Sequence, residues 1–175
     1  MPKGLKTTSS LITIGFEVTE SGANTFTQGQ VDLQLNPLDN EVFVVQAVNL
    51  DPSNPDATAG TNTNVDAGLT TTSRTAMPNL SDSAALAIAS NAIRADAVIG
   101  VGFSKTSMET PPSGLEYIGI IATNDFFVQV LGTGNAGAKK VSGKLYGYRA
   151  RADAAVMQLL FNPKYCHPDR GFNPG

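Results

Sequence analysis

The chain has 175 residues, which suits a single domain with a core large enough to be stable without cross-links. It is 41% hydrophobic but only 15% charged, against about 25% charged residues in an average globular domain. A surface of neutral polar residues suits a protein whose faces are partly covered by neighbouring molecules. The single cysteine excludes a disulfide framework within the chain, and no stretch approaches the roughly 20 apolar residues of a membrane-spanning helix.

Apolar and polar residues alternate along much of the chain, and this period of two predicts half-buried strands. Residues 41–50 are almost continuously apolar, which predicts a strand covered on both faces. In chain order, the expected strands are 12–18, 30–35, 41–50, 97–103, 115–122, 126–130 and 141–151.

Two segments depart from this alternation. Residues 51–83 are rich in Pro, Asn, Thr and Gly, which predicts a long middle loop with one short strand near 68–73. Ser81–Asp82–Ser83 can cap a helix over 84–93, although the same segment also fits a strand. Residues 153–161 fit either a short helix or a last strand.

Seven or eight antiparallel strands, with no helix placed regularly between them, predict an all-β antiparallel sandwich or barrel. We expect one domain over residues 1–175, with an N-terminal arm over 1–10, a long middle loop and at most one or two short helices. Residues 162–175 are expected to form a C-terminal tail.

Charge is segregated along the chain. From Thr7 to Ser73 there are eight acidic residues and no Lys or Arg, whereas five basic residues gather between Lys139 and Arg151. Aromatic residues interleaved with bases can stack on single-stranded nucleic acid. The alternative, which we favour, is pairing of the arginines with carboxylates within or between subunits. The candidate contact residues, to a subunit or to nucleic acid, are Lys139, Lys140, Lys144, Tyr146, Tyr148, Arg149 and Arg151.

Motifs for catalysis or cofactor binding are weak. Residues 132–137 spell G-x-G-x-x-G after a strand, but the next segment alternates as a strand, so a glycine-rich hairpin loop is favoured over a dinucleotide site. Cys166 and His167 are adjacent, and neighbouring side chains on an extended chain point to opposite sides, which suits a nucleophile–base pair poorly. Asp51 and Asp56 could ligate calcium, but without the EF-hand spacing. We therefore expect no enzyme, no cofactor and no metal.

The second half of the chain resembles a known family. Residues 115–135 (LEYIGIIATNDFFVQVLGTGN), followed by 139–153 (KKVSGKLYGYRARAD), resemble the C-terminal strands of single jelly-roll capsid proteins from environmental, largely marine, tailless icosahedral viruses. Residues 16–26 (FEVTESGANTF) and 41–56 (EVFVVQAVNLDPSNPD) are similar to the opening of the same core. The resemblance skips the middle of the chain. It implies a jelly-roll that associates into rings and then a shell, without catalytic residues.

We therefore expect a structural virion protein, a capsid subunit made in the host cytoplasm, with copies of itself and other virion proteins as partners. The expected contact elements are the arm 1–10, the loop 51–80 and the tail 162–175, with non-specific contact to a packaged genome as a further expectation. The alternative is a carbohydrate- or surface-binding β-sandwich of lectin or adhesin type. The absence of Trp and the aromatic content of 7% argue against that alternative, because sugar rings stack on exposed aromatic side chains.

Overall fold

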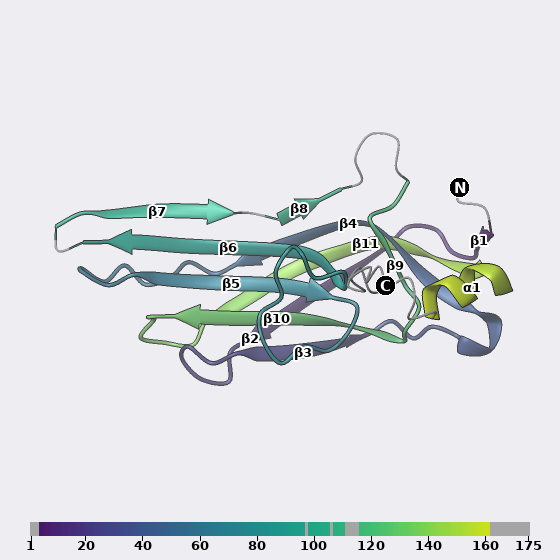
Figure 1. Ribbon diagram of the computed structural model, residues 1–175, viewed down its shortest axis with the longest axis horizontal. Coiled ribbons are helices and arrows are strands. Elements are labelled where there is room, and N and C mark those ends of the chain that lie inside the picture. Colours follow the sequence, from purple (N-terminus) through teal and green to yellow (C-terminus); the bar gives the residue numbers. More distant parts are fainter. Residues whose placement is uncertain (1–3, 97, 106, 111–115, 162–175) are drawn as a thin grey trace, which may run out of the picture.

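The computed structural model describes residues 4–96, 98–105, 107–110 and 116–161 (Figure 1). These residues form eleven strands, one short 3-10 turn over Pro37–Asp39 and one helix, α1, over Ala154–Phe161. The strands are β1 Leu5–Thr7, β2 Ile12–Thr19, β3 Thr27–Asp32, β4 Glu41–Pro52, β5 Thr63–Thr70, β6 Ala85–Ala95, β7 Gly100–Lys105, β8 Ser107–Glu109, β9 Gly119–Ile121, β10 Asp125–Thr133 and β11 Lys140–Ala152.

The strands form two sheets that lie face to face (Figure 1). In sheet A, β11 and β4 are neighbours; β1 and β2 pair with the free side of β11, and β8 and β9 pair with the free side of β4. Sheet B has the order β3-β10-β5-β6-β7. All of the described pairings are antiparallel, and the predicted all-β antiparallel sandwich is confirmed.

The pairing is nested along the chain: β2 pairs with β11, β3 with β10, β4 with β9 and β5 with β6. The chain therefore runs like one long antiparallel hairpin, whose successive strand pairs alternate between sheet A and sheet B. Eight strands belong to this nested set. The eleven strands of the described residues exceed the seven or eight expected, because β1, β7 and β8 lie outside it.

Strand β4 is buried on both faces, as its continuous apolar sequence predicted. Phe43 and Val45 pack in the main core between the sheets, whereas Val42 and Val44 pack in a smaller core on the outer face of sheet A. Gln46 is an extra residue in β4, because the register with β11 shifts at this point. Such a bulge reverses the alternation, and the residues beyond it return to the main core.

The smaller core lies under helix α1, which covers one end of sheet A (Figure 1). Val156, Met157 and Leu160 of the helix pack there against Leu5 of β1. Leu5 pairs with Ala152 of β11, so residues 5–7 form an edge strand of their own subunit. Residues 5–7 of the predicted arm 1–10 therefore belong to sheet A of their own subunit, and contact of the arm with a neighbour stays a prediction. Residues 1–3 and the predicted tail 162–175 lie outside the described residues.

The middle loop predicted over 51–83, with one short strand near 68–73, is wrong in extent, because the strand there is the longer β5 and begins earlier, at Thr63. Val65, Ala67 and Leu69 are fully buried in the main core and alternate with Asn64 and two other outward positions. A period of two was therefore present in this segment. It was hidden by the small and polar residues around it, since β5 is short of large apolar side chains.

The helix predicted for residues 84–93 is also wrong, and the alternative interpretation as a strand is confirmed: this segment is β6. Ala87 and Ala89 are buried in the main core, and the strand pairs with β5 on one side and β7 on the other. The hydrogen bonds to β5 and β7 satisfy the backbone groups of β6 on both sides. Their contribution outweighs the helix preference of alanine, which is a few tenths of a kcal/mol per residue. The strand predicted over 115–122 is shorter than expected, since β9 covers only Gly119–Ile121.

The loop that remains between β5 and β6 lies over the outer face of sheet B. The Arg74 backbone N–H donates to Gln28 Oε1 at 2.7 Å, and its guanidinium donates twice to Asp82, at 2.7 and 2.6 Å. The side-chain hydrogen bond from Arg74 holds the pKa of Asp82 below its ordinary value. The loop also covers Gln129, which is fully buried and donates to Thr70 Oγ1 at 2.7 Å. These contacts hold the loop against its own subunit.

Candidate functional site

The seven candidate contact residues lie on or just before β11, the strand between β2 and β4 in sheet A. Val141 and Leu145 point into the main core, so the residues at even-numbered positions of this stretch face outward. The alternation places Lys140, Lys144 and Tyr146 on the outer face of the sheet, and Tyr148 packs there against the smaller core. The predicted basic and aromatic strand therefore exists, but the two tyrosines are half-buried.

The basic residues of this stretch are largely paired with the acidic first half of the same subunit. Four of the five have a carboxylate partner: Lys139 with Asp56 at 2.5 Å, Lys140 with Glu17 at 3.0 Å, Arg149 with Glu41 at 4.0 Å and Arg151 with Asp39 at 2.8 Å. Lys144 is exposed and has no carboxylate partner among the residues that the structure describes. The charge segregation seen in the sequence thus becomes neutralisation in the fold.

The two arginines differ in their surroundings. Arg149 donates to the Leu33 carbonyl oxygen at 2.9 Å and lies beside Glu41, whose side chain is only 16% exposed. Its Nε is buried without a hydrogen-bond partner among the described residues. The Arg151 pair lies at the surface, with Arg151 55% and Asp39 51% exposed. Arg149 therefore contributes to the fold, whereas the exposed pair contributes little.

Lys139 precedes β11 and ties two loops together. Its Nζ contacts Asp56 Oδ1, and Asp56 Oδ2 accepts the Ala136 backbone N–H at 2.8 Å. The side-chain hydrogen bond from Lys139, followed by the Ala136 amide, holds the pKa of Asp56 below its ordinary value of 3.8. Asp56 is therefore occupied by partners from its own chain.

The glycine motif over residues 132–137 is a crossover between the two sheets. The hairpin expected there is wrong, because β10 lies in sheet B and β11 in sheet A. The Gly132 N–H donates to Oε1 of the buried Glu20 at 2.7 Å. Gly134 has φ 71°, and a Cβ there would lie 2.5 Å from the Asn62 carbonyl oxygen. The glycines thus serve a close backbone approach, and the strand that follows supplies no helix N-terminus for a phosphate.

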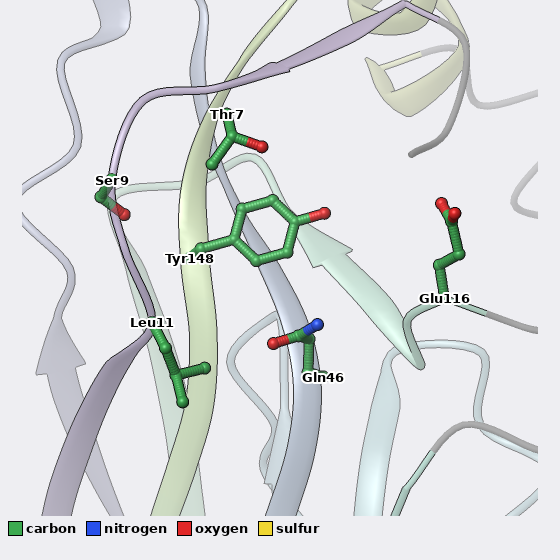
Figure 2. Close-up of a pocket in the computed structure, with 6 residues that line it drawn as sticks. All are labelled: Thr7, Ser9, Leu11, Gln46, Glu116 and Tyr148. Atoms are coloured by element: carbon green, nitrogen blue, oxygen red, sulfur yellow. The ribbon is translucent and has the colours of Figure 1, made fainter.

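An open cleft of about 520 Å³ lies on the outer face of sheet A. In Figure 2 the Tyr148 ring lies between Thr7 and Gln46, with its hydroxyl directed to the side of Glu116. Burial, together with the negative charge of Glu116, raises the pKa of the Tyr148 phenol above 10.0, so the hydroxyl keeps its proton at neutral pH. The residues that line the cleft are Thr7, Ser9, Leu11, Gln46, Glu116 and Tyr148 (Figure 2).

The cleft offers hydrogen bonds and an aromatic ring rather than a nucleophile beside a base. No group of three or more His, Cys, Asp or Glu side chains that suits a metal ion occurs in the described part of the chain. Cys166 and His167 lie outside the described residues. Among the residues that the structure describes, no helix has the length and apolarity needed to cross a membrane.

A second surface, which the charge pattern did not single out, lies along β7. Every residue of this strand is exposed, and the turn before it adds further exposed apolar side chains. We call this surface the β7 edge; its apolar members are Val98, Ile99, Val101 and Phe103. The sequence signal was the alternation over 97–103, which predicted a half-buried strand; Ala97 lies outside the described residues. Only the position of β7 at the end of sheet B explains its exposure.

Comparison with known proteins assigns the chain to no family. No family model matches the sequence, and no curated protein matches it.

Proposed function

We propose that the protein is a capsid subunit of a virion, a single jelly-roll that assembles with copies of itself and with other virion proteins into a shell. The observation that carries the proposal is the nested pairing of β2 with β11, β3 with β10, β4 with β9 and β5 with β6. A jelly-roll is a double sheet of eight strands, and viral capsid proteins are among the classes that use it. Lectins and cupins use it as well, so the strand order needs further support.

The charge distribution supports a structural role. The ion pairs of Lys139, Lys140, Arg149 and Arg151 are made within the subunit, which leaves Lys144 as the exposed base of this stretch without a carboxylate among the described residues. Affinity for nucleic acid depends on the number of phosphates that free bases neutralise. Contact of β11 with a packaged genome is therefore weak in this proposal, and contact between subunits dominates.

The test is the assembly state of the purified chain. We expect size-exclusion chromatography with light scattering, followed by negative-stain microscopy, to find rings or closed particles as concentration and salt are raised. Weak contacts repeated by symmetry give a stable whole, so particles should appear over a narrow concentration range. A monodisperse monomer under all of these conditions would overturn the proposal.

The cleft around Tyr148 favours a second candidate, a carbohydrate- or surface-binding module of lectin or adhesin type. An aromatic ring, an amide from Gln46 and hydroxyls in an open cleft are the groups that recognise a sugar. If this candidate is right, a glycan array identifies a ligand, and Tyr148→Ala weakens its binding at least tenfold while Lys144→Ala does not. Absence of any glycan ligand for the unaltered chain removes the candidate.

A further inference from the structure

We propose that two copies of the chain join through their β7 strands, antiparallel and related by a two-fold axis at Gly102, so that the two B sheets become one continuous sheet. The contact would be one of those by which the proposed shell assembles, and in that role it rests on the proposed function. The pairing itself follows from the β7 edge alone.

Strand β7 is an open edge. It is the last strand of sheet B, and it pairs only with β6 among the described residues (Figure 1). Edge strands present unpaired N–H and C=O groups to other chains, and proteins usually protect them with prolines, bulges or several charges. Between Gly100 and Lys105 there is no proline, no register shift with β6 and only one charge. Val101 and Phe103 are 51% and 58% exposed.

The glycines of β7 have no role within the subunit. A Cβ at Gly102 would meet nothing within 4 Å, and neither Gly100 nor Gly102 is among the glycines with a positive φ. Glycine weakens a strand interior, and it often marks a place where another backbone approaches closely. The fold does not require Gly102, and its position beside an open edge fits an approach from outside.

The hydrogen bonds of the β6–β7 turn determine which groups of β7 face outward. The Asp96 N–H donates to the Ile99 carbonyl oxygen at 2.9 Å, so Ile99 turns its backbone groups toward β6. In an antiparallel ladder this direction alternates, so Gly100, Gly102 and Ser104 turn theirs away from β6. A second β7 strand centred on Gly102 pairs Gly102 with its own copy and Gly100 with Ser104. All three outward-facing residues then gain backbone partners.

This register is also favourable for the side chains. It places Val101 of each copy opposite Phe103 of the other, in a pair without mutual backbone bonds, where side chains lie closest. Val101 and Phe103 pair with Arg94 and Ala92 of β6 and lie on the outer face of sheet B. An aromatic residue opposite a β-branched one is a favourable cross-strand pair.

The charges are complementary in the same register. Lys105 of one copy lies opposite Ile99 of the other, and Asp96 is next to Ile99 across the turn. The Asp96 carboxylate is held in place by the Val98 N–H at 2.8 Å and the Ile99 N–H at 3.3 Å. Because of the two-fold axis, Lys105 of each copy lies near Asp96 of the other, so this contact occurs twice. No residues of like charge face each other in this register. The occupant that fits the β7 edge is therefore a second copy of the chain.

The test introduces cysteines into a Cys166→Ser background of the full chain. Gly102→Cys places two thiols directly opposite each other, at a Cα separation of about 5.5 Å that suits a disulfide. Ser104→Cys is the matched control, because position 104 of one copy lies opposite position 100 of the other. The two positions 104 are therefore offset by four residues along the strands, about 13 Å. Under mild oxidation we expect a covalent dimer from Gly102→Cys and none from Ser104→Cys. Equal cross-linking of both variants, or of neither, would overturn the proposed register.

A second pair of variants tests the surface without cysteines. Phe103→Lys removes the cross-strand pair, and we expect it to weaken self-association at least tenfold in sedimentation velocity. Leu80→Lys makes the same change at a residue that is 70% exposed on another loop, and it should associate as the unaltered chain does. Association that Phe103→Lys leaves unchanged would contradict a β7 contact.

The outcomes separate this inference from the proposed function. Particles that form without cross-linking at position 102 overturn the β7 contact and leave the shell proposal standing. Specific cross-linking at position 102 in a chain that never forms rings or particles supports the β7 contact and removes the shell.

Discussion

Strands β11 and β7 both contain basic and apolar residues, yet their surroundings are opposite. β11 lies between β2 and β4, and its bases are mostly paired with carboxylates of the same subunit. β7 lies at the end of sheet B, and all of its residues are exposed. Its own Lys105 and the adjacent Arg94 of β6 have no carboxylate partner among the described residues. The difference teaches that availability for a partner depends on strand position and on pairing within the fold, rather than on residue type.

The largest expected effect compares one glycine in each strand. A Cβ at Gly147 of β11 would collide with the Val44 carbonyl oxygen and lie 2.5 Å from the Phe43 ring, whereas a Cβ at Gly102 would meet nothing. We expect Gly147→Ala to lower the free energy of unfolding by about 3 kcal/mol, since neither neighbour can move freely. Gly102→Ala should change it by less than about 0.5 kcal/mol. Urea denaturation of both variants measures the difference, and equal losses would break the contrast between the strands.

A smaller effect separates the two arginines at the end of β11. Arg149→Ala leaves the Leu33 carbonyl oxygen and the largely buried Glu41 without their cation, so we expect a loss of about 2 kcal/mol in the free energy of unfolding. Arg151→Ala removes a pair that is half exposed on both sides, and the loss should be below about 0.5 kcal/mol. Thermal and urea unfolding provide the measurement. A larger loss at Arg151 would mean that the buried contacts of Arg149 do not stabilise β11.

The smallest effect concerns acid pH. The pKa of Asp56 is lowered chiefly by Lys139, and that of Asp96, beside β7, by the Val98 and Ile99 amides. A carboxyl whose folded pKa lies below its unfolded value stabilises the fold at higher pH. That contribution is complete above about pH 4 and is lost as the pH falls through the folded pKa.

The variants Asp56→Asn and Asp96→Asn should each make the fall of the urea midpoint between pH 4 and pH 2 shallower. In 1 M salt the effect of Asp56→Asn should shrink more than that of Asp96→Asn, because salt screens the attraction between two charged side chains more than hydrogen bonds to uncharged amides. Identical salt dependence of the two variants would show that the Lys139 charge does not contribute.

Much of the fold could be predicted from alternation alone. The strands over 12–18 and 141–151 correspond closely to β2 and β11, and the buried character of β4 was visible in its continuous apolar run. The failures lie between β4 and β7. There β5 and β6 are rich in alanine and small polar residues, whose strand preferences are weak, so neighbouring strands rather than propensity decided their structure.

The site was predicted less completely. Charge segregation identified the residues of β11 that pair, and the favoured interpretation of Arg–carboxylate pairing agrees with the contacts of Arg149 and Arg151 within the subunit. Which acid meets which base could not be foreseen, because the partners of the β11 bases are separated by 83 to 123 positions in the chain and meet only through sheet register and the loops. The β7 edge was missed, since alternation marks a strand but not its place in a sheet.

The sequence by itself determined the β class, the absence of an internal disulfide and the two pools of opposite charge, because these depend on composition and on a period of two. The tertiary structure alone decided that most bases of β11 are neutralised within the subunit while β7 stays uncovered. Burial and ion pairing are properties of neighbours in space, and the nested strand order brings distant segments together. The same residue types therefore became a satisfied central strand in one place and an open edge in the other.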